Sequence, residues 1–293
     1  MADMLGFTTL GELGEAVARR LLTQSTRLAV FDADDGALSR LARLGARVLE
    51  SPRQVADCAE FVFGAPTGEQ AAPLARSVAQ GQAARIFVNI STIGPPAIRV
   101  LEEVLGSTGI RLVDAPLSGT PKEADRGTLR LVLSGAAADL DRVEKIAAAF
   151  ASRISKMGER PGQAQICALI GDALGLTALA ASCEAVAVGT AAGIASGVLV
   201  DVIDAGTGRN SATADLLPHD VLTRTFGSGE SLGDALGKLD LYLDEAAGVR
   251  IPAGVVAETR ALAAKAADQI GPAQDVTAIV RYFEAFVGAK VAG

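Results

Sequence analysis

Two hydrophobic patterns divide the chain near residue 161. Before that point, short apolar runs with β-branched or aromatic residues alternate with segments in which apolar residues recur at helical spacing. The short runs predict strands at 4–7, 28–31, 61–63, 86–88 and 112–113. The amphipathic segments predict helices at 12–22, 35–43, 68–79, 96–105 and 138–150. Regular alternation of strand and helix indicates a parallel sheet covered by helices on both faces.

After residue 161 the strand-like runs disappear, and Ala, Leu and Glu dominate. Pro161 and Gly162 favour a break just before this part of the chain. Helices are expected at 163–194, 197–205, 210–217, 231–247, 252–269 and 275–288. We therefore predict an α/β protein: a doubly wound sheet domain over 1–161, a long inter-domain helix, and an all-α substrate and dimerisation domain over 162–293.

Composition restricts the class of partner. A chain of 293 residues is long enough for two domains. Its net charge of −7 and its lack of Trp argue against nucleic-acid binding, which needs phosphate contacts and stacking surfaces. The apolar stretch 164–203 is interrupted by Asp172 and Glu184, so a buried helix is expected there and not a membrane span.

Cysteine and histidine usage predicts no metal site. Cys58, Cys167 and Cys183 lack metal-ligand spacing, and the single histidine, His219, cannot form a multi-histidine site. Three unpaired thiols suggest a reducing compartment. The first residues already read as a strand and not as a signal peptide, so we expect a cytoplasmic protein.

A glycine-containing turn follows the first predicted strand. In a dinucleotide-binding turn, three glycines permit the tight turn, the approach of a pyrophosphate and close helix packing. Gly11 and Gly14 occupy the second and third positions, and Thr9 replaces the first. The same pattern also fits an ordinary βα turn. Its position on the first strand favours a Rossmann-like cofactor site, formed by Thr9, Leu10, Gly11, Leu13 and Gly14.

The second predicted strand ends at Asp32, eighteen residues beyond Gly14. An acid at this point accepts hydrogen bonds from the adenosine ribose hydroxyls and repels a 2′-phosphate. Ala33 follows, where an arginine would be needed to bind that phosphate. We therefore expect NAD as the cofactor, with NADP possible. Asp32 could instead serve as a cap for the following helix.

Several motifs beyond this turn carry a family resemblance. They are 89–92 (Asn-Ile-Ser-Thr), 114–119 (Asp-Ala-Pro-Leu-Ser-Gly), 205–211 and 222–226. With them the chain resembles, over essentially its whole length, the β-hydroxyacid dehydrogenase family of the 3-hydroxyisobutyrate dehydrogenase type. Imine reductases are relatives of this family. The resemblance implies hydride transfer between a nicotinamide cofactor and a small substrate, and a homodimer assembled with help from the long helix.

The resemblance also implies roles for individual residues. Ser118, Gly119 and Thr120 would hold a substrate carboxylate, although the family more often has a second glycine at position 120. Pro66 and Thr92 would lie near the ribose and nicotinamide of the cofactor. The alternative for 118–120 is a plain turn after a strand.

The chain departs from the family pattern where the acid–base group is expected. Counting back from Glu184 places the family's catalytic lysine at Ala168 and its companion amide at Asp172. The family's Lys-Asp pair falls on Gly237 and Lys238. Alanine can neither polarise a forming carbonyl nor accept a hydroxyl proton, as a lysine does.

Three hypotheses follow from these departures. In the first, an NAD(P)-dependent oxidoreductase acts on a small hydroxy or oxo acid or an imine, with Asp172 and Lys238 as its catalytic residues. In the second, the protein is a catalytically weak or inactive NAD-binding family member that serves as a binding or sensor subunit. In the third, residues 162–172 are misaligned, and Lys156 or Lys122 supplies the amine. The first is our prediction.

Overall fold

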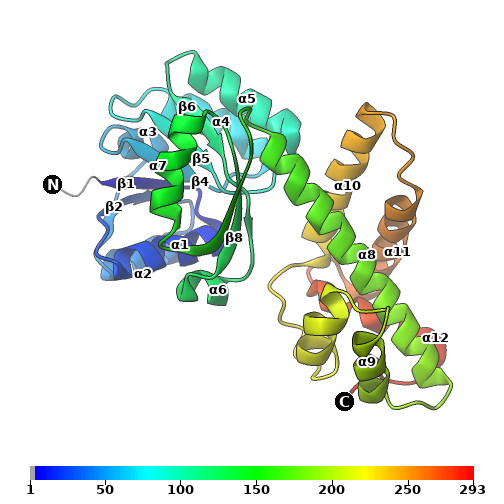
Figure 1. Ribbon diagram of the computed structural model, residues 1–293. Coiled ribbons are helices and arrows are strands. Elements are labelled where there is room, and N and C mark those ends of the chain that lie inside the picture. The colour runs from blue at the N-terminus through cyan, green and yellow to red at the C-terminus, as the bar shows by residue number, and fades with distance from the viewer. Residues whose placement is uncertain (1–3) are drawn as a thin grey trace. The chain divides into compact units, whose positions relative to one another are not determined.

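The computed structural model describes residues 4–293 in two compact units, one ending at Ala168 and the other beginning at Leu169 (Figure 1). The domain boundary expected from the sequence, between 161 and 162, falls just before helix α8, which begins at Gln163. Each unit has its own hydrophobic core.

The first unit contains a nine-stranded sheet ordered β3-β2-β1-β4-β5-β6-β8-β7, with β9 also paired to β8. Strands β1 to β6 pair in parallel, and β8 pairs antiparallel to β6 and β7. The order reverses at β1, the switch point at which such sheets bind ligands. The strands are β1 (Leu5–Thr8), β2 (Leu28–Phe31), β3 (Arg47–Val48), β4 (Phe61–Gly64), β5 (Ile86–Asn89), β6 (Arg111–Asp114), β7 (Leu117–Ser118), β8 (Leu129–Ser134) and β9 (Ala151–Gly158).

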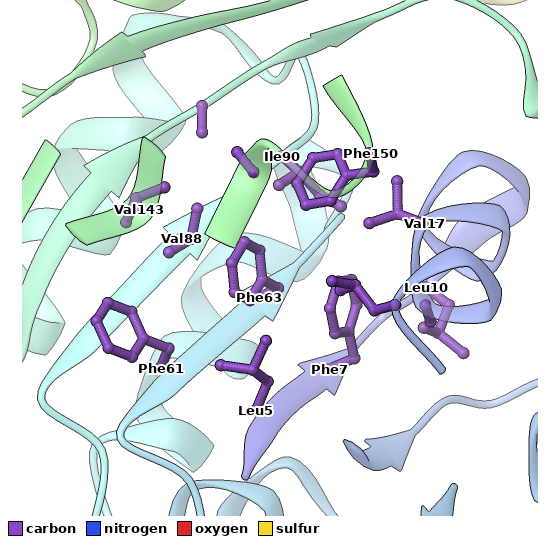
Figure 2. Packing of buried hydrophobic residues seen from close by; sticks show 14 of the residues in the cluster. Leu5, Phe7, Leu10, Val17, Phe61, Phe63, Val88, Ile90, Val143 and Phe150 are labelled. Carbon is purple, nitrogen blue, oxygen red and sulfur yellow. The ribbon is translucent and has the colours of Figure 1, made fainter. Parts of the chain in front are cut away.

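Helices cover both faces of this sheet, and alternate residues of the central strands β4 and β5 point into two different cores. One core includes Phe7 and Phe63, whose rings stack with centroids 4.9 Å apart, and Figure 2 shows both among the residues of that cluster. The other includes Val62 and Phe87. The helices are α1 (Gly11–Thr23), α2 (Asp35–Arg43), α3 (Pro52–Ala56), α4 (Gly68–Val78), α5 (Gly94–Gly106), α6 (Pro121–Arg126) and α7 (Ala137–Ala147).

The second unit is built from helices around one core, and its described residues contain only an isolated β-bridge between Ser231 and Asp275. This confirms the predicted fold class. Its elements are α8 (Gln163–Ala191), which starts in the first unit, α9 (Ser196–Ala205), the π-helix η1 (Ala212–Val221), α10 (Leu232–Gly248), α11 (Gly254–Ile270), the 3₁₀-helix η2 (Val276–Ile279) and α12 (Val280–Val287).

Helix α8 is long and apolar enough to cross a membrane by length and composition alone. In this structure, 39% of its most apolar stretch is buried, so the helix is only partly buried, whereas the sequence led us to expect a buried one. Among its exposed residues are three large apolar ones, each four positions from the next: Ile166, Ile170 and Leu174.

Candidate active site

The turn after β1 has two residues in the left-handed region of the backbone. Thr9, in the position of the first glycine, adopts φ +51°, and Gly11 adopts φ +56°. This left-handed region is open to glycine and costly for a β-branched residue. The Thr9 hydroxyl donates a 2.6 Å hydrogen bond to the Thr8 carbonyl. The loop therefore keeps the glycine conformation at Thr9 although the glycine is gone.

The N-terminus of α1 is suited to an anion. Its N-cap, Leu10, makes no side-chain capping hydrogen bond, so the N–H groups of the first turn have no side-chain acceptor from the cap. A Cβ added at Gly14 would meet Ile90 at 3.6 Å and Ala65 at 3.8 Å, which are ordinary contacts. Close packing therefore does not require glycine at position 14.

Asp32 lies just beyond β2 and faces the same loop. Its Oδ2 accepts a 2.5 Å hydrogen bond from the Leu10 N–H, and its Oδ1 accepts one from Asp34 N at 2.8 Å. Asp34, and not Asp32, is the N-cap of α2. Each carboxylate oxygen has two lone pairs, so Asp32 can still accept hydrogen bonds from ribose hydroxyls. The loop, the open helix terminus and this acid fit an NAD molecule.

Pro66 and Thr92 lie on the loops that follow β4 and β5, at the same carboxyl edge of the sheet. Ser91 links the two loops, because its hydroxyl donates to the Pro66 carbonyl at 2.7 Å. Pro66 is buried and Thr92 is half-buried. The structure thus brings together the residues predicted to bind the cofactor.

The predicted substrate residues 118–120 run from the last residue of β7, Ser118, to the N-cap of α6. Gly119 has φ +136°, and Thr120 is the N-cap of α6. Thr120 and Glu123 form a capping box: the Glu123 carboxylate accepts from the Thr120 N–H at 2.8 Å, and the Thr120 hydroxyl accepts from the Glu123 N–H at 3.3 Å. A substrate carboxylate at Thr120 would therefore compete with the carboxylate of Glu123.

A buried polar cluster joins Asn89 and Asp114, from the motifs at 89–92 and 114–119, to Gln165, which no sequence motif indicated. Asp114 accepts four hydrogen bonds, from Asn89 Nδ2, Gln165 Nε2, Gly162 N and Gln165 N. Burial raises the pKa of the Asp114 carboxyl to about 6, although these donors act in the opposite direction. The Gln165 side-chain oxygen accepts from Ile93 N and Gly94 N at 2.8 and 2.9 Å. The cluster fixes the start of α8 to the strand ends.

The second unit brings Asp172 and Lys238 together. Lys238 Nζ, on α10, lies 3.4 Å from Asp172 Oδ2, on α8, and 2.7 Å from Glu230 Oε1 in the loop before α10. All three line a cavity of about 140 Å³, hereafter the α8–α10 cavity, whose other lining residues are uncharged. These are Gly171, Gly175, Leu176, Leu179, Ser211, Leu216, Ala235 and Val276.

The electrostatics of this cavity keep Lys238 protonated. Burial by itself would lower the pKa of the Lys238 ammonium, but the Glu230 and Asp172 carboxylates outweigh it and raise that pKa above its ordinary value. Glu230 was not identified from the sequence. A lone Glu in a loop of Gly and Ser carries no local signal of its partner eight residues away.

The other candidate amines are placed differently. Lys156, on β9, lies 2.6 Å from both Asp141 Oδ1 and Glu144 Oε2, and these carboxylates raise the pKa of Lys156. It is thus engaged in ion pairs within the first unit. Lys122 is exposed on α6. Neither amine lines the α8–α10 cavity.

Comparison with known proteins agrees with the two-part architecture. Residues 4–158 match the NAD-binding domain of 6-phosphogluconate dehydrogenase, and residues 162–283 match the NAD-binding model of NADP-dependent 3-hydroxyisobutyrate dehydrogenase. The chain belongs to the β-hydroxyacid dehydrogenase family. It is an oxidoreductase of this family that uses NAD(P).

Relatives of known identity cover nearly the whole chain. The 3-sulfolactaldehyde reductase of Escherichia coli is 27% identical over 97% of both chains. The solved structure of Mycobacterium tuberculosis 3-hydroxyisobutyrate dehydrogenase with L-serine is 24% identical, with a TM-score of 0.88 over 96% of this chain and 99% of that one. A Myxococcus stipitatus imine reductase variant in complex with NAD+ is 20% identical, with a TM-score of 0.61 over 97% of this chain and 99% of that one.

Proposed function

We propose that the protein transfers a hydride between NAD(H) and a small hydroxy or oxo acid, and that Asp172 and Lys238 replace the acid–base lysine of the family. The observation that carries this proposal is the placement of Lys238 Nζ 3.4 Å from Asp172 Oδ2 in one cavity. A cytoplasmic location fits this activity.

The first unit would hold the cofactor, which when bound supplies or accepts the hydride. The open N-terminus of α1 favours the pyrophosphate, and Gly11 leaves the backbone free of a side chain there. The Asp32 carboxylate would accept hydrogen bonds from the adenosine ribose hydroxyls and repel a 2′-phosphate, so NAD is preferred over NADP. Pro66 and Thr92 would border the ribose and nicotinamide.

In the oxidation direction, the substrate hydroxyl must lose its proton as the carbon loses hydride. The Asp172 carboxylate accepts that proton, and the Lys238 ammonium stabilises negative charge on the substrate oxygen. The reverse steps serve reduction: the Asp172 carboxyl returns the proton to the oxygen of the carbonyl. Lys238 keeps its proton throughout, since the Glu230 carboxylate stays 2.7 Å from its Nζ when Asp172 is protonated.

Imine reduction is a second candidate, and one observation favours it. The N–H of Thr120, which would hold a substrate carboxylate, donates to the Glu123 carboxylate at 2.8 Å, and the Thr120 hydroxyl is 3.1 Å from the same oxygen. An imine without a carboxylate needs no such donor. Asp172 would then supply the proton for the imine nitrogen.

Steady-state turnover with NADH tests both candidates on a panel of 3-oxo acids and cyclic imines. Asp172→Asn and Lys238→Met should each lower kcat by about 10²-fold or more, the usual contribution of a positioned acid or base. NADH affinity should stay unchanged in both. Lys265→Met removes an exposed helix lysine of the same unit outside the cavity and should leave kcat at the wild-type value. Wild-type turnover in Asp172→Asn would refute the assigned role.

A homodimer completes the proposal. Ile166, Ile170 and Leu174 recur every four residues on α8, and their exposed fractions are 42%, 44% and 64%. Residues at this spacing share one helix face. An exposed apolar row of this kind is typical of a subunit interface.

A further inference from the structure

Lys238 has two acidic neighbours, and the closer one is not the residue predicted from the sequence. Glu230 Oε1 lies 2.7 Å from Lys238 Nζ, against 3.4 Å for Asp172 Oδ2. Glu230 precedes the Ser231 N-cap of α10, and Lys238 follows two turns into the same helix. The Lys238 ammonium therefore has one carboxylate neighbour from the loop that leads into its own helix, Glu230, and one from α8, Asp172.

The backbone of Glu230 is fixed independently of its side chain. Its carbonyl accepts a 2.8 Å hydrogen bond from Val276 N. The next residue, Ser231, forms an antiparallel bridge with Asp275. The Asp275 carboxylate also accepts from the Ser228 hydroxyl at 2.9 Å and from Gly229 N at 3.1 Å. The loop that carries Glu230 is thus tied down on both sides of this residue.

The negative charge of the Glu230 side chain is compensated by Lys238. Its Oε1 is buried, and among the described residues no well-aligned hydrogen-bond donor reaches it. A buried carboxylate oxygen is costly unless a charge or donor compensates it. The ammonium at 2.7 Å is that charge, so Glu230 and Lys238 constrain each other.

We propose that Glu230 is a positioning residue, which fixes the Lys238 ammonium as a permanently charged hydrogen-bond donor and leaves proton exchange to Asp172. An ammonium has three N–H donors. With two carboxylates as neighbours, at least one donor remains for an oxygen or nitrogen atom in the α8–α10 cavity. This assignment deepens the proposed function and rests on it for the substrate step alone.

The charged surroundings of Lys238 are simple enough to test. Among residues 4–293, the charged side chains that line the cavity with Lys238 are Asp172 from α8 and Glu230 from the loop before α10. The residues contributed by η1, η2 and the rest of α10 are uncharged. Changes in the titration of Lys238 can therefore be attributed to these two carboxylates.

The first measurement needs no activity. Protein labelled with ¹³C and ¹⁵N in its lysines is titrated by NMR, and Lys238→Met assigns the Lys238 signal among the six lysines of the chain. In Glu230→Gln the pKa of Lys238 should fall by about one to two units, because an opposite charge at this distance is lost. Glu230→Asp keeps the charge and should restore part of the shift. An unchanged Lys238 pKa in Glu230→Gln overturns the proposal.

Glu230→Asp also covers the event that Glu230→Gln does not fold. The shorter side chain lengthens the ion pair, so the Lys238 pKa should lie below the wild-type value, and an identical pKa would again overturn the proposal.

The second measurement is the pH profile of kcat/KM. In Glu230→Gln the alkaline limb should move down by the same one to two units as the Lys238 pKa, and a purely structural glutamate would not move it. A shifted Lys238 pKa with an unmoved alkaline limb refutes the positioning role. If Lys238→Met also keeps full turnover, the proposed function fails instead, while the Glu230–Lys238 pair stands on the NMR titration.

Discussion

Replacement of Asp114 by Asn tests the charge state of the buried cluster at the start of α8. Asp114 is fully buried, and its pKa is raised to about 6 from an ordinary value of 3.8. One pKa unit corresponds to about 1.4 kcal/mol. The difference therefore amounts to about 3 kcal/mol between the protonated and the ionised protein.

The sign of the effect follows from proton binding. Between about pH 3.8 and 6 the folded protein keeps the Asp114 proton and the unfolded chain has lost it. The contribution of Asp114 to the free energy of unfolding is therefore largest below pH 3.8 and falls as the pH rises through 6. Because Asn does not titrate, the free energy of unfolding of the wild type relative to Asp114→Asn should fall by about 2–3 kcal/mol between pH 4 and pH 7.

Urea unfolding followed by circular dichroism at pH 4, 5, 6 and 7 measures this difference. Ser134→Ala is the matched control, because the Ser134 hydroxyl accepts from Ala164 N at the same helix start and does not titrate. It should cost about 1 kcal/mol at every pH. A wild-type to Asp114→Asn difference that stays constant with pH would show that the four donors cancel the effect of burial, and our account of Asp114 would be wrong.

Two further predictions concern the cofactor and the subunit interface. NADH should bind more tightly than NADPH in fluorescence titrations, and Asp32→Ser should weaken NADH by about 10-fold, the loss of a hydrogen bond to a charged group, while NADPH binding changes less. Tighter NADPH binding by the wild type would contradict this. Leu174→Glu should convert the proposed dimer to a monomer in light scattering, since it puts a charge on the exposed apolar row of α8. A wild type that is already monomeric would remove the dimer from the proposal.

The periodicity of the sequence predicts the elements with large, regular cores. The runs at 28–31, 61–63 and 86–88 are β2, β4 and β5, and nearly all their residues are buried, which is why they read as continuous apolar runs. No strand is predicted at β8, although Leu129, Leu131 and Leu133 alternate with exposed or half-buried residues. This alternation with a period of two residues is typical of a half-buried strand. β9 is mostly exposed and gives no comparable signal.

The candidate site likewise contains residues that the sequence predicts and residues that it does not. The turn after β1 is predictable because its function constrains neighbouring residues, and the structure shows Thr9 in a glycine conformation. The Asp172–Lys238 contact joins residues 66 apart in sequence, so only the family resemblance pointed to both positions. Glu230 and Gln165 act through tertiary contacts and carry no motif. Neither could be found from the sequence alone.

The charged residues of the α8–α10 cavity can be compared to decide which of them takes part in proton transfer and which only form an ion pair. The family resemblance implies an aspartate at the position of Lys238, and in this structure Glu230 is the closest carboxylate, 2.7 Å from the Lys238 Nζ. The resemblance likewise implies an amide at position 172, so Asp172 adds a second carboxylate beside Lys238, 3.4 Å from its Nζ. A carboxylate in a cavity lined mainly by apolar side chains costs free energy unless a charge compensates it, and the charge near Asp172 is the Lys238 ammonium. We expect Asp172→Asn to lose turnover without losing stability, because Lys238 keeps its closest carboxylate, Glu230. Removal of Glu230 or Lys238, in contrast, leaves a charge without its closest partner and should lower the free energy of unfolding. This difference between the variants is what we expect if Asp172 exchanges the proton and Glu230 and Lys238 form a fixed ion pair.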